Sequence, residues 1–561
     1  MSSSRSQRLG RIAACTALVV AAGTLLSAGP AFGAPQESST APGKSTFASK
    51  PAKPRLDLDG DGWSDVLYRN HRGLSYSVQT TSNSLSGTGF KVYGQDKEAV
   101  RDIVALGNIR GGWGPELLQW SRDGRLSLHQ AYKSGTQAPT WTGTGWQIYN
   151  KLIAVGDLTK DGRGDLLART PSGNLYLYRA TGSASGNPFA DRIKVGSGWG
   201  SYDQIVGAND LDADGIADLV AKNPDGNLYY YKGTGNASAP FKTRTLVGGG
   251  WNIYSKIAGG DDLTGDGKAD LWAIAPDGTR YIYASKGNGV FGGRMIAGGP
   301  NAGPGWTNAD LFVNSGVTPI YGKHGVQGVD ASRSVWEHGN LTTGRFAPEP
   351  FPYAEKLPAG ITLINAAAVN KYNWTTRYGW NGSTLTEASS GTPIKGTFTG
   401  SNLILGPGDL TGNGLGDLLT RDTGGTLWLR AGNGTVDWFG APTKIGPGWG
   451  AYKSIVGGGD ITGDGRTDIV AAATDGKLYL YRGTGKATAP FGARELIGSG
   501  WNTYNTLASP GDLNGDGRAD LVARDANGDM WLYKTTGNGG SKTFTARTFL
   551  DKGWNGYKQF N

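Results

Sequence analysis

The 561-residue sequence predicts an all-β protein, a β-propeller built of about ten four-stranded blades. Three observations lead to this prediction. Glycine, with 94 residues, is too frequent for helix interiors, while 18 Trp and 24 Tyr suit half-buried strands. Short apolar runs alternate with Asp-Gly turns and show no helical period. A unit of about fifty residues recurs along most of the chain, as in repeat architectures.

The first 34 residues predict an export signal. Three arginines precede an apolar stretch at residues 12–26, and small residues stand at 31–34. The stretch is too short to span a bilayer comfortably, so we expect a secreted protein with no membrane contact after signal removal. The alternative is an uncleaved N-terminal anchor. Residues 35–55, rich in Ser, Thr, Pro, Ala and Lys, predict a flexible linker.

Composition excludes several kinds of site and partner. Cys15 is the single cysteine, so an internal disulfide and a multi-cysteine metal centre are excluded. The net charge of +9 falls to +6 without the three signal arginines, and no Lys/Arg run accompanies it, so we expect no nucleic-acid partner. No motif of a serine hydrolase, zinc protease or phosphate-binding loop occurs, so we expect no enzyme. His324 and His338 lie in the most diverged stretch, residues 317–400.

The repeat is marked by an acidic nine-residue loop of the form DxDxDGxxD. Seven copies begin at Asp57, Asp157, Asp210, Asp262, Asp409, Asp460 and Asp512. A glycine that suits a hairpin turn follows sixteen residues after each first Asp, at Gly73, Gly173, Gly226, Gly278, Gly425, Gly476 and Gly528. Three degenerate units complete the count of ten. They begin at Asn108, with its turn at Asp123-Gly124, near Val317, with Ser334–Trp336 in its second strand, and near Ala366, with its turn at Asn381-Gly382.

Within a unit, four strand-like runs follow the loop. In the unit of Asp460 they are residues 468–472, 478–482, 494–497 and a Gly-Trp segment at 501–507. The first unit lacks this last segment before its loop, whereas the chain ends on such a segment at residues 553–560. A terminal strand that completes another unit's sheet hides the edges of a ring. Because residues 306–312 resemble that segment too, we favour two five-bladed rings, at residues 56–313 and 314–561, with diverged repeats at 314–405.

The loop spacing predicts a calcium site. Oxygen ligands stand at positions 1, 3, 5 and 9, a backbone carbonyl is available at position 7, and Gly at position 6 permits a sharp turn. Hard oxygen ligands in a flexible loop favour Ca²⁺ over Mg²⁺. The alternative is that these Asp and Gly residues are plain turn formers. That alternative does not account for three close acids together, since like charges repel without a cation.

The loop, the Asp-Leu after it and the blade length resemble the FG-GAP and VCBS-type repeats of secreted bacterial proteins. Those repeats are related to the propeller of integrin α subunits, whose blade loops bind calcium. The resemblance covers roughly residues 56–561 and implies several Ca²⁺ ions, one in each intact loop. The implied ligands are Asp57, Asp59, Asp61 and Asp65; Asp157, Asp161 and Asp165; Asp210, Asp212, Asp214 and Asp218; Asp262, Asp266 and Asp270; Asp409, Asn413 and Asp417; Asp460, Asp464 and Asp468; and Asp512, Asn514, Asp516 and Asp520.

The loops differ in their number of acids. Position 3 is Thr in four loops and Asn514 in another, and Asn413 replaces the acid at position 5 of the Asp409 loop. Since fewer carboxylates bind calcium more weakly, we expect the loops of Asp57 and Asp210 to bind most tightly. The Asp409 loop should be weakest or empty, and the three degenerate units should bind none.

Tryptophans that follow glycine raise a second possibility. They stand at Trp146, Trp199, Trp251, Trp306, Trp449, Trp501 and Trp554. Exposed Trp faces stack on sugars, but recurrence in every unit favours a packing wedge between blades. We therefore expect an extracellular adhesion or interaction scaffold, a monomer that binds an extracellular protein or a cell-wall or surface glycan. The alternative is a lectin-like protein that binds carbohydrate in Trp-lined clefts.

Overall fold

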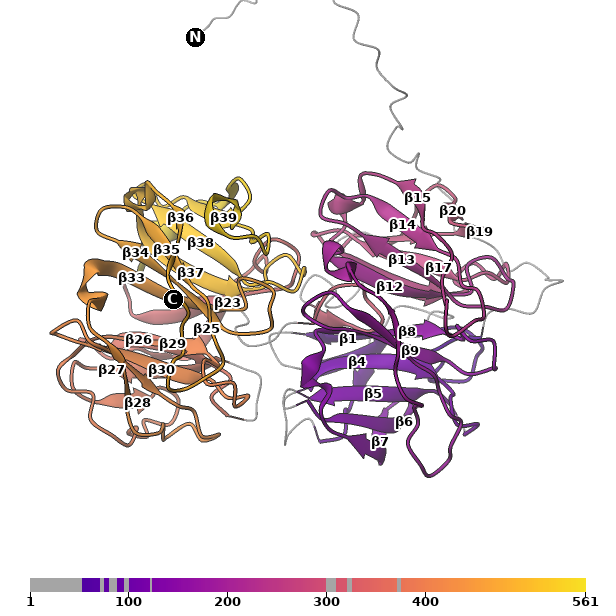
Figure 1. Cartoon of the computed structure of the whole chain (residues 1–561), viewed down its shortest axis with the longest axis horizontal. Coiled ribbons are helices and arrows are strands. Elements are labelled where there is room, and N and C mark those ends of the chain that lie inside the picture. The colour runs from indigo at the N-terminus through magenta and orange to yellow at the C-terminus, as the bar shows by residue number, and fades with distance from the viewer. Residues whose placement is uncertain are drawn as a thin grey trace, which may run out of the picture. The chain divides into compact units, whose positions relative to one another are not determined.

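The computed structural model describes residues 53–70, 75–79, 88–94, 100–112, 114–121, 124–298, 309–319, 325–370 and 375–561. Its regular elements are antiparallel β-strands and single turns of 3-10 helix, so the predicted all-β class is confirmed (Figure 1). In these residues no helix is long and apolar enough to cross a membrane. The predicted signal and most of the predicted linker lie outside the described residues.

The first five sheets have four strands each. From the innermost strand outward they are β22 (Ala309–Phe312), β1 (Val66–Asn70), β2 (Ser75–Gln79) and β3 (Thr88–Phe90); β4 (Val100–Gly107), β5 (Glu116–Ser121), β6 (Leu126–Tyr132) and β7 (Gly135–Gly143); β8 (Lys151–Gly156), β9 (Asp165–Arg169), β10 (Leu175–Tyr178) and β11 (Ile193–Gly196); β12 (Gln204–Asn209), β13 (Asp218–Lys222), β14 (Leu228–Tyr231) and β15 (Thr245–Gly248); and β16 (Lys256–Asp261), β17 (Asp270–Ile274), β18 (Arg280–Tyr283) and β21 (Met295–Gly298). A small hairpin, β19 (Ser285–Gly287) and β20 (Val290–Phe291), projects from the fifth.

The second five sheets repeat this order, except that the described part of the second one has three strands. They are β41 (Tyr557–Phe560), β23 (Gly325–Asp330), β24 (Ser334–Gly339) and β25 (Phe351–Lys356); β26 (Thr362–Ala367), β27 (Thr375–Trp380) and β28 (Leu385–Glu387); β29 (Ser401–Gly408), β30 (Asp417–Asp422), β31 (Leu427–Arg430) and β32 (Thr443–Gly446); β33 (Tyr452–Gly459), β34 (Asp468–Ala473), β35 (Leu478–Tyr481) and β36 (Glu495–Gly498); and β37 (Tyr504–Gly511), β38 (Asp520–Asp525), β39 (Met530–Tyr533) and β40 (Thr548–Asp551).

Each set of five sheets takes one strand from its far end. β22 pairs with β1, with Phe312 opposite Tyr68, and β41 pairs with β23, with Phe560 opposite Gly328. The predicted completion of an early sheet by a late strand is thereby confirmed. Pairing buries an edge that would otherwise offer free N–H and C=O groups.

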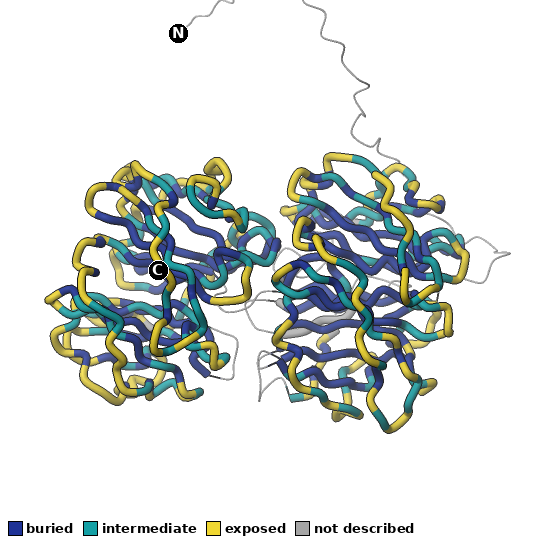
Figure 2. Tube along the Cα trace, in the orientation of Figure 1, coloured by how far each residue is buried: buried dark blue, intermediate teal, exposed yellow. Residues whose placement is uncertain are grey.

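The hydrophobic core lies between neighbouring sheets. Ten clusters of buried side chains occupy ten junctions, five in each set. One cluster joins Trp272 of the fifth sheet to Tyr68 of the first, and another joins Val522 of the tenth to Val326 of the sixth. Each series of sheets therefore packs back onto its own first member. Figure 2 shows the result as buried strands with exposed connecting loops.

Arg55 ties the centre of the first five sheets together. Its Nε lies 2.7 Å from Oδ1 of Asp261 on β16, and its Nη1 donates to the carbonyls of Ala154 on β8 and Gly207 on β12. Both charged side chains are almost fully buried. Arg55, placed by the sequence at the end of a flexible linker, is thus part of the folded core.

The Gly-Trp segments differ from the predicted strand in their first half. Each forms one 3-10 turn, and the strand that follows is the innermost strand of the next sheet. In the segment at Trp501, Gly500 adopts φ +80°, a left-handed conformation that glycine tolerates best, and β37 starts at Tyr504. The turns are η1 (Trp146–Ile148), η2 (Trp199–Ser201), η3 (Trp251–Ile253), η5 (Trp449–Ala451), η6 (Trp501–Thr503) and η8 (Trp554–Gly556); a separate turn is η7 (Gly540–Lys542).

Candidate metal sites

Six of the seven acidic loops connect an innermost strand to the next strand, and the Asp57 loop leads directly into β1. The first and ninth residues hold each loop in the same way. A carboxylate oxygen of position 1 accepts the N–H of the position 6 glycine at 2.6–3.0 Å. Oδ2 of position 9 accepts the N–H of position 2 at 2.7–3.1 Å. Backbone bonding thus accounts for both acids without a metal, which is what the turn-forming alternative requires.

The carboxylate at position 9 is buried in every loop. Removal from water disfavours the charged form, and this burial raises the pKa of Asp65, Asp165, Asp218, Asp270 and Asp417 to about 7. A cation bound beside such a group would stabilise its ionised form. The backbone N–H groups therefore balance only part of the negative charge of the carboxylates in each loop.

In four loops a basic residue at position 7 balances part of this negative charge. Arg163 pairs with Asp161, Lys268 with Asp266, Arg466 with Asp464 and Arg518 with Asp516, at N···O distances of 2.8–3.5 Å. In these loops position 3 is Thr or Asn. In the two loops with four acids, position 7 is Trp63 or Ile216. None of the seven loops thus has both a basic residue at position 7 and an acid at position 3.

Within the residues that the structure describes, two groups of three carboxylates have oxygens within 4.8 Å of one another. One is Asp57, Asp59 and Asp61, and the other is Asp210, Asp212 and Asp218. These are the two loops with four acids. The acids of the other five loops, although they occupy the same backbone positions, form no such group in the described chain.

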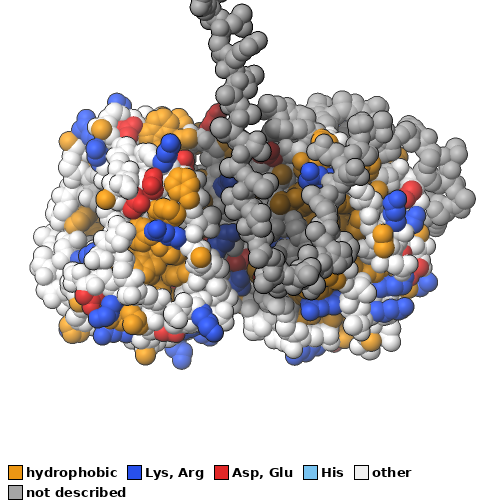
Figure 3. All heavy atoms as spheres, turned by 90° about the horizontal axis from the view of Figure 1, so that it is seen from above, with side chains coloured by type: hydrophobic (Ala, Val, Ile, Leu, Met, Phe, Trp, Pro, Cys, Tyr) orange, Lys and Arg blue, Asp and Glu red, His pale blue; other side chains and the backbone are white. Residues whose placement is uncertain are grey.

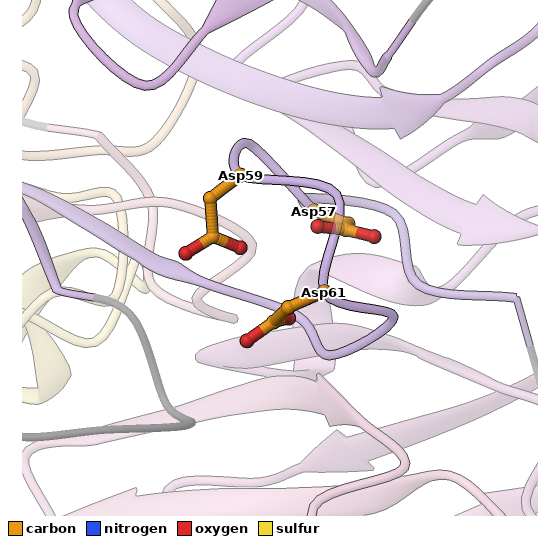
Figure 4. Close-up of side chains that lie close together, drawn as sticks. All are labelled: Asp57, Asp59 and Asp61. Carbon is orange, nitrogen blue, oxygen red and sulfur yellow. The ribbon is translucent and has the colours of Figure 1, made fainter.

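The Asp57 loop has an unused buried oxygen. Figure 4 shows Asp57, Asp59 and Asp61 around one turn of this loop. Oδ2 of Asp65 accepts the N–H of Leu58, whereas its buried Oδ1 has no hydrogen-bond partner among the described residues. In the described part of the chain one cation pairs with this loop: Nζ of Lys133 lies 3.6 Å from Oδ2 of Asp59, and the Lys133 side chain is about half exposed.

In the other six loops the corresponding oxygen is occupied. Oδ1 of position 9 accepts the backbone N–H of the residue fifteen positions later, at 2.8–3.1 Å. In the Asp57 loop this oxygen of Asp65 has no partner among the described residues, and the residue fifteen positions later, Thr80, lies outside them. A hard cation such as Ca²⁺ would have this oxygen available as a ligand.

The Asp210 loop already holds a cation. Nζ of Lys232, which follows β14, contacts the carboxylate of Asp212 and lies 2.8 Å from that of Asp214. The side chain of Asp212 is only 5% exposed, and its Oδ1 has no partner. An ammonium therefore neutralises part of the charge that a metal ion would otherwise balance. The sequence analysis missed Lys232, because a basic residue after this strand also occurs in other units, such as Arg482.

Comparison with known proteins supports the repeat. A family model described as "FG-GAP-like repeat" matches residues 157–221 and 460–523. The chain carries FG-GAP-like repeats in these two segments. Each match begins at one acidic loop and ends just beyond the next, so it covers the loops of Asp157, Asp210, Asp460 and Asp512.

Other comparisons add little. No curated protein matches the chain. Among solved structures, a lectin named BP39L from Burkholderia pseudomallei is similar over 72% of this chain and 99% of its own, with 14% identity and a TM-score of 0.26. A TM-score this low carries no argument about fold or ligand.

Two further loops, outside the matched segments, show how the carboxylates are replaced. In the Asp409 loop, the side-chain amide of Asn413 donates to the carbonyl of Gly432 at 2.9 Å, and the hydroxyl of Thr411 lies within 3.4 Å of both Asp409 and Asp417. In the degenerate loop of Asn108, Glu116 takes the place of the position 9 acid and accepts the N–H of Ile109. Neighbouring protein groups thus occupy the space between the remaining acids.

The described tryptophans that follow glycine are buried at the sheet junctions. The six in the described residues are 4–8% exposed. Trp501 packs 4.5 Å from the ring of Tyr533, whose hydroxyl pairs with that of Tyr504, and Arg547 donates to Tyr504 at 2.6 Å. The expected packing role is confirmed for these six, and Trp306 lies outside the described residues. Beside Trp501 a cleft of about 360 Å³ remains.

Proposed function

We propose that this is a secreted calcium-binding scaffold that presents loops of its propeller to an extracellular protein or a surface glycan. The observation that carries the calcium assignment is the Asp57 loop. It combines three close carboxylates with the unpartnered buried oxygen of Asp65. Carboxylate oxygens in a flexible loop are the ligands that Ca²⁺ prefers, so the residues fit the ion.

Calcium would supply positive charge that this loop, whose one paired cation among the described residues is the half-exposed Lys133, otherwise lacks. Asp57, Asp59, Asp61 and Asp65 would hold it, joining both ends of the loop before β1. Since β1 also pairs with the closing strand β22, an ordered loop would support the junction between the first and fifth sheets. We infer that the ion has a structural role and that the partner binds the propeller surface and not the ion itself.

Occupancy should differ among the loops. Lys232 competes with a metal in the Asp210 loop, and the basic residues at position 7 compete in four others. We therefore propose the Asp57 loop as the tightest site and the Asp210 loop as a weaker second one. This separates two loops that their acid counts alone rank equally.

A melting experiment tests the proposal. An ion that binds the folded chain but not the unfolded chain raises the free energy of unfolding by about 2.7 kcal/mol when its concentration is a hundredfold above its Kd. Thermal unfolding in Ca²⁺, in Mg²⁺ alone and in chelator should therefore give a clearly higher Tm with Ca²⁺. Identical curves in all three would mean that the loops are turns held by backbone hydrogen bonds.

A second candidate function, carbohydrate binding, has one observation in its favour. The cleft beside Trp501 is rimmed by hydroxyl groups, including those of Ser541 and Thr545, and by Arg547. Because the tryptophan itself is buried, a sugar would meet the rim and only the edge of the ring. A glycan array with the wild type and Arg547→Ala tests this. Equal signals for both proteins would contradict binding in this cleft.

The surface is consistent with a protein or glycan partner. On the face drawn in Figure 3, the described Lys and Arg side chains stand among hydrophobic and neutral ones. Nucleic acid binding favours a continuous basic patch, so we propose no nucleic-acid partner. We also propose no catalytic role and a monomeric state, as the sequence predicts.

A further inference from the structure

One sheet junction has no fully buried aromatic ring, unlike the others. The cluster between the sixth and seventh sheets has four buried members, all aliphatic: Val329, Val335, Leu357 and Leu363. The ring of Tyr353 packs against it but is only partly buried. Each of the other nine junction clusters contains at least one buried Phe, Tyr or Trp. This junction lies in the diverged repeats.

A cavity of about 160 Å³ adjoins this aliphatic cluster. Val335, Leu357 and Leu363 line it, together with Ile361 and Ala388. Polar groups at its boundary include Lys356 and Thr386. The cavity therefore lies against the part of the junction core that is short of side-chain volume.

Backbone features keep the cavity open. Gly379 on β27 lines it, and a Cβ there would come within 2.8 Å of Ile361, so the strand and the Ile361 side chain pack directly on each other. On the other wall, Glu387 accepts N–H bonds from Ser389 and Ser390 and a hydroxyl bond from Ser389, which fixes the turn that carries Gly391. These walls are built by hydrogen bonds and close packing.

We propose that this cavity is a binding site for a small molecule with one aromatic ring. At the other junctions buried rings of the chain fill the core, whereas Tyr353 is only partly buried here and does not line the cavity, so space for one ring remains. The size agrees, because an aliphatic cavity of about 150 Å³ binds benzene. The site is independent of the calcium loops and extends beyond the proposed scaffold function.

Ligand-observed fluorine NMR with fluorobenzene on the full chain tests the proposal. Wild type should show saturable binding that is the same in Ca²⁺ and in chelator. Ala388→Leu, which fills the cavity from the residue after β28, should weaken binding by about tenfold or more. Leu246→Phe, a similar enlargement on exposed β15, should leave it unchanged.

Leu363→Phe provides a second filling variant from the opposite wall. It should also abolish binding while its Tm stays at or above that of the wild type, because the new ring occupies existing space. A wild type without saturable binding would overturn the proposal. So would either filling variant, folded by its melting curve, that binds fluorobenzene as tightly as the wild type.

Discussion

At the scale of single residues, charge balance distinguishes loops that share one backbone. Every loop keeps the acids at positions 1 and 9 because they accept backbone N–H groups. The residue at position 7 decides what balances the remaining charge, a guanidinium or ammonium in four loops and none in the Asp57 loop. Position 3 then carries an acid only where position 7 is apolar.

Lys232→Met should turn the Asp210 loop into a tighter calcium site. The ammonium contacts Asp212 and lies 2.8 Å from Asp214, so its removal leaves uncompensated charge for the ion. At such distances the attraction between two unit charges is several kcal/mol at an effective dielectric constant of about 20. The affinity of the loop for Ca²⁺ should therefore rise by about tenfold or more. Terbium luminescence titration measures it, with Lys477→Met, which removes an exposed pair, as the control. An unchanged affinity would exclude Lys232 as the competing cation.

Arg55→Ala should destabilise the first five sheets strongly. It leaves the almost fully buried carboxylate of Asp261 without its cation, and breaking such a pair costs about 3–5 kcal/mol. Urea unfolding measures the loss. Arg482→Ala, which removes a partly exposed pair with Glu495, should cost less than about 1 kcal/mol. Equal effects of the two changes would argue against Arg55 as a central tie.

The sequence predicts the loops and turns well at this scale, but not their charge partners. The glycines at the sixteen-residue offset that lie in the described chain all adopt φ between 77° and 85°. The Asp212–Lys232 contact joins side chains twenty residues apart, and it depends on how β14 lies against the loop. Repetition reveals backbone requirements because they recur, whereas one side chain in one unit leaves no pattern.

At the scale of elements, the aromatic wedge joins one sheet to the next. Tyr–Tyr hydroxyl pairs at 2.5–2.7 Å recur at five junctions, each with a Trp packed beside them. An Arg near the outer strand donates to the same Tyr, as Arg494 does to Tyr452. In the sixth wedge, His338 replaces one Tyr and accepts or donates to Tyr557 at 2.8 Å.

Trp501→Ala should therefore cost about 3–5 kcal/mol in stability, because it removes a large buried ring from the junction of the ninth and tenth sheets. Trp438→Ala is the matched control, since Trp438 is 48% exposed and should tolerate the change. Chemical denaturation of both variants provides the comparison. A Trp501 variant as stable as the control would mean that the ring serves a ligand and not the core.

At the scale of the whole molecule, each series of five sheets is completed by a strand from its far end. The sequence reveals this arrangement through the incomplete first unit and the Gly-Trp segment that ends the chain. It does not reveal that the segment begins with a 3-10 turn, because a single turn of three residues has no period to detect.

Removal of residues 553–561 should open the second series. It deletes β41, exposes the edge of β23 and takes Trp554 and Phe560 from the junction core. We expect faster proteolysis of residues 325–561 and a lower Tm. Lys558→Ala, an exposed change on the same strand, should have neither effect. A truncated chain with the wild-type Tm would contradict closure by the last strand.

Calcium titration by isothermal calorimetry of the wild type, Asp61→Asn and Asp464→Asn tests the central claim most directly. Asp61 belongs to a close carboxylate group, whereas Asp464 pairs with Arg466. The wild type should show a tightest site that Asp61→Asn removes and Asp464→Asn retains. If both variants weaken calcium binding equally, or if the wild type binds none, the assignment of the ion to the Asp57 loop is wrong.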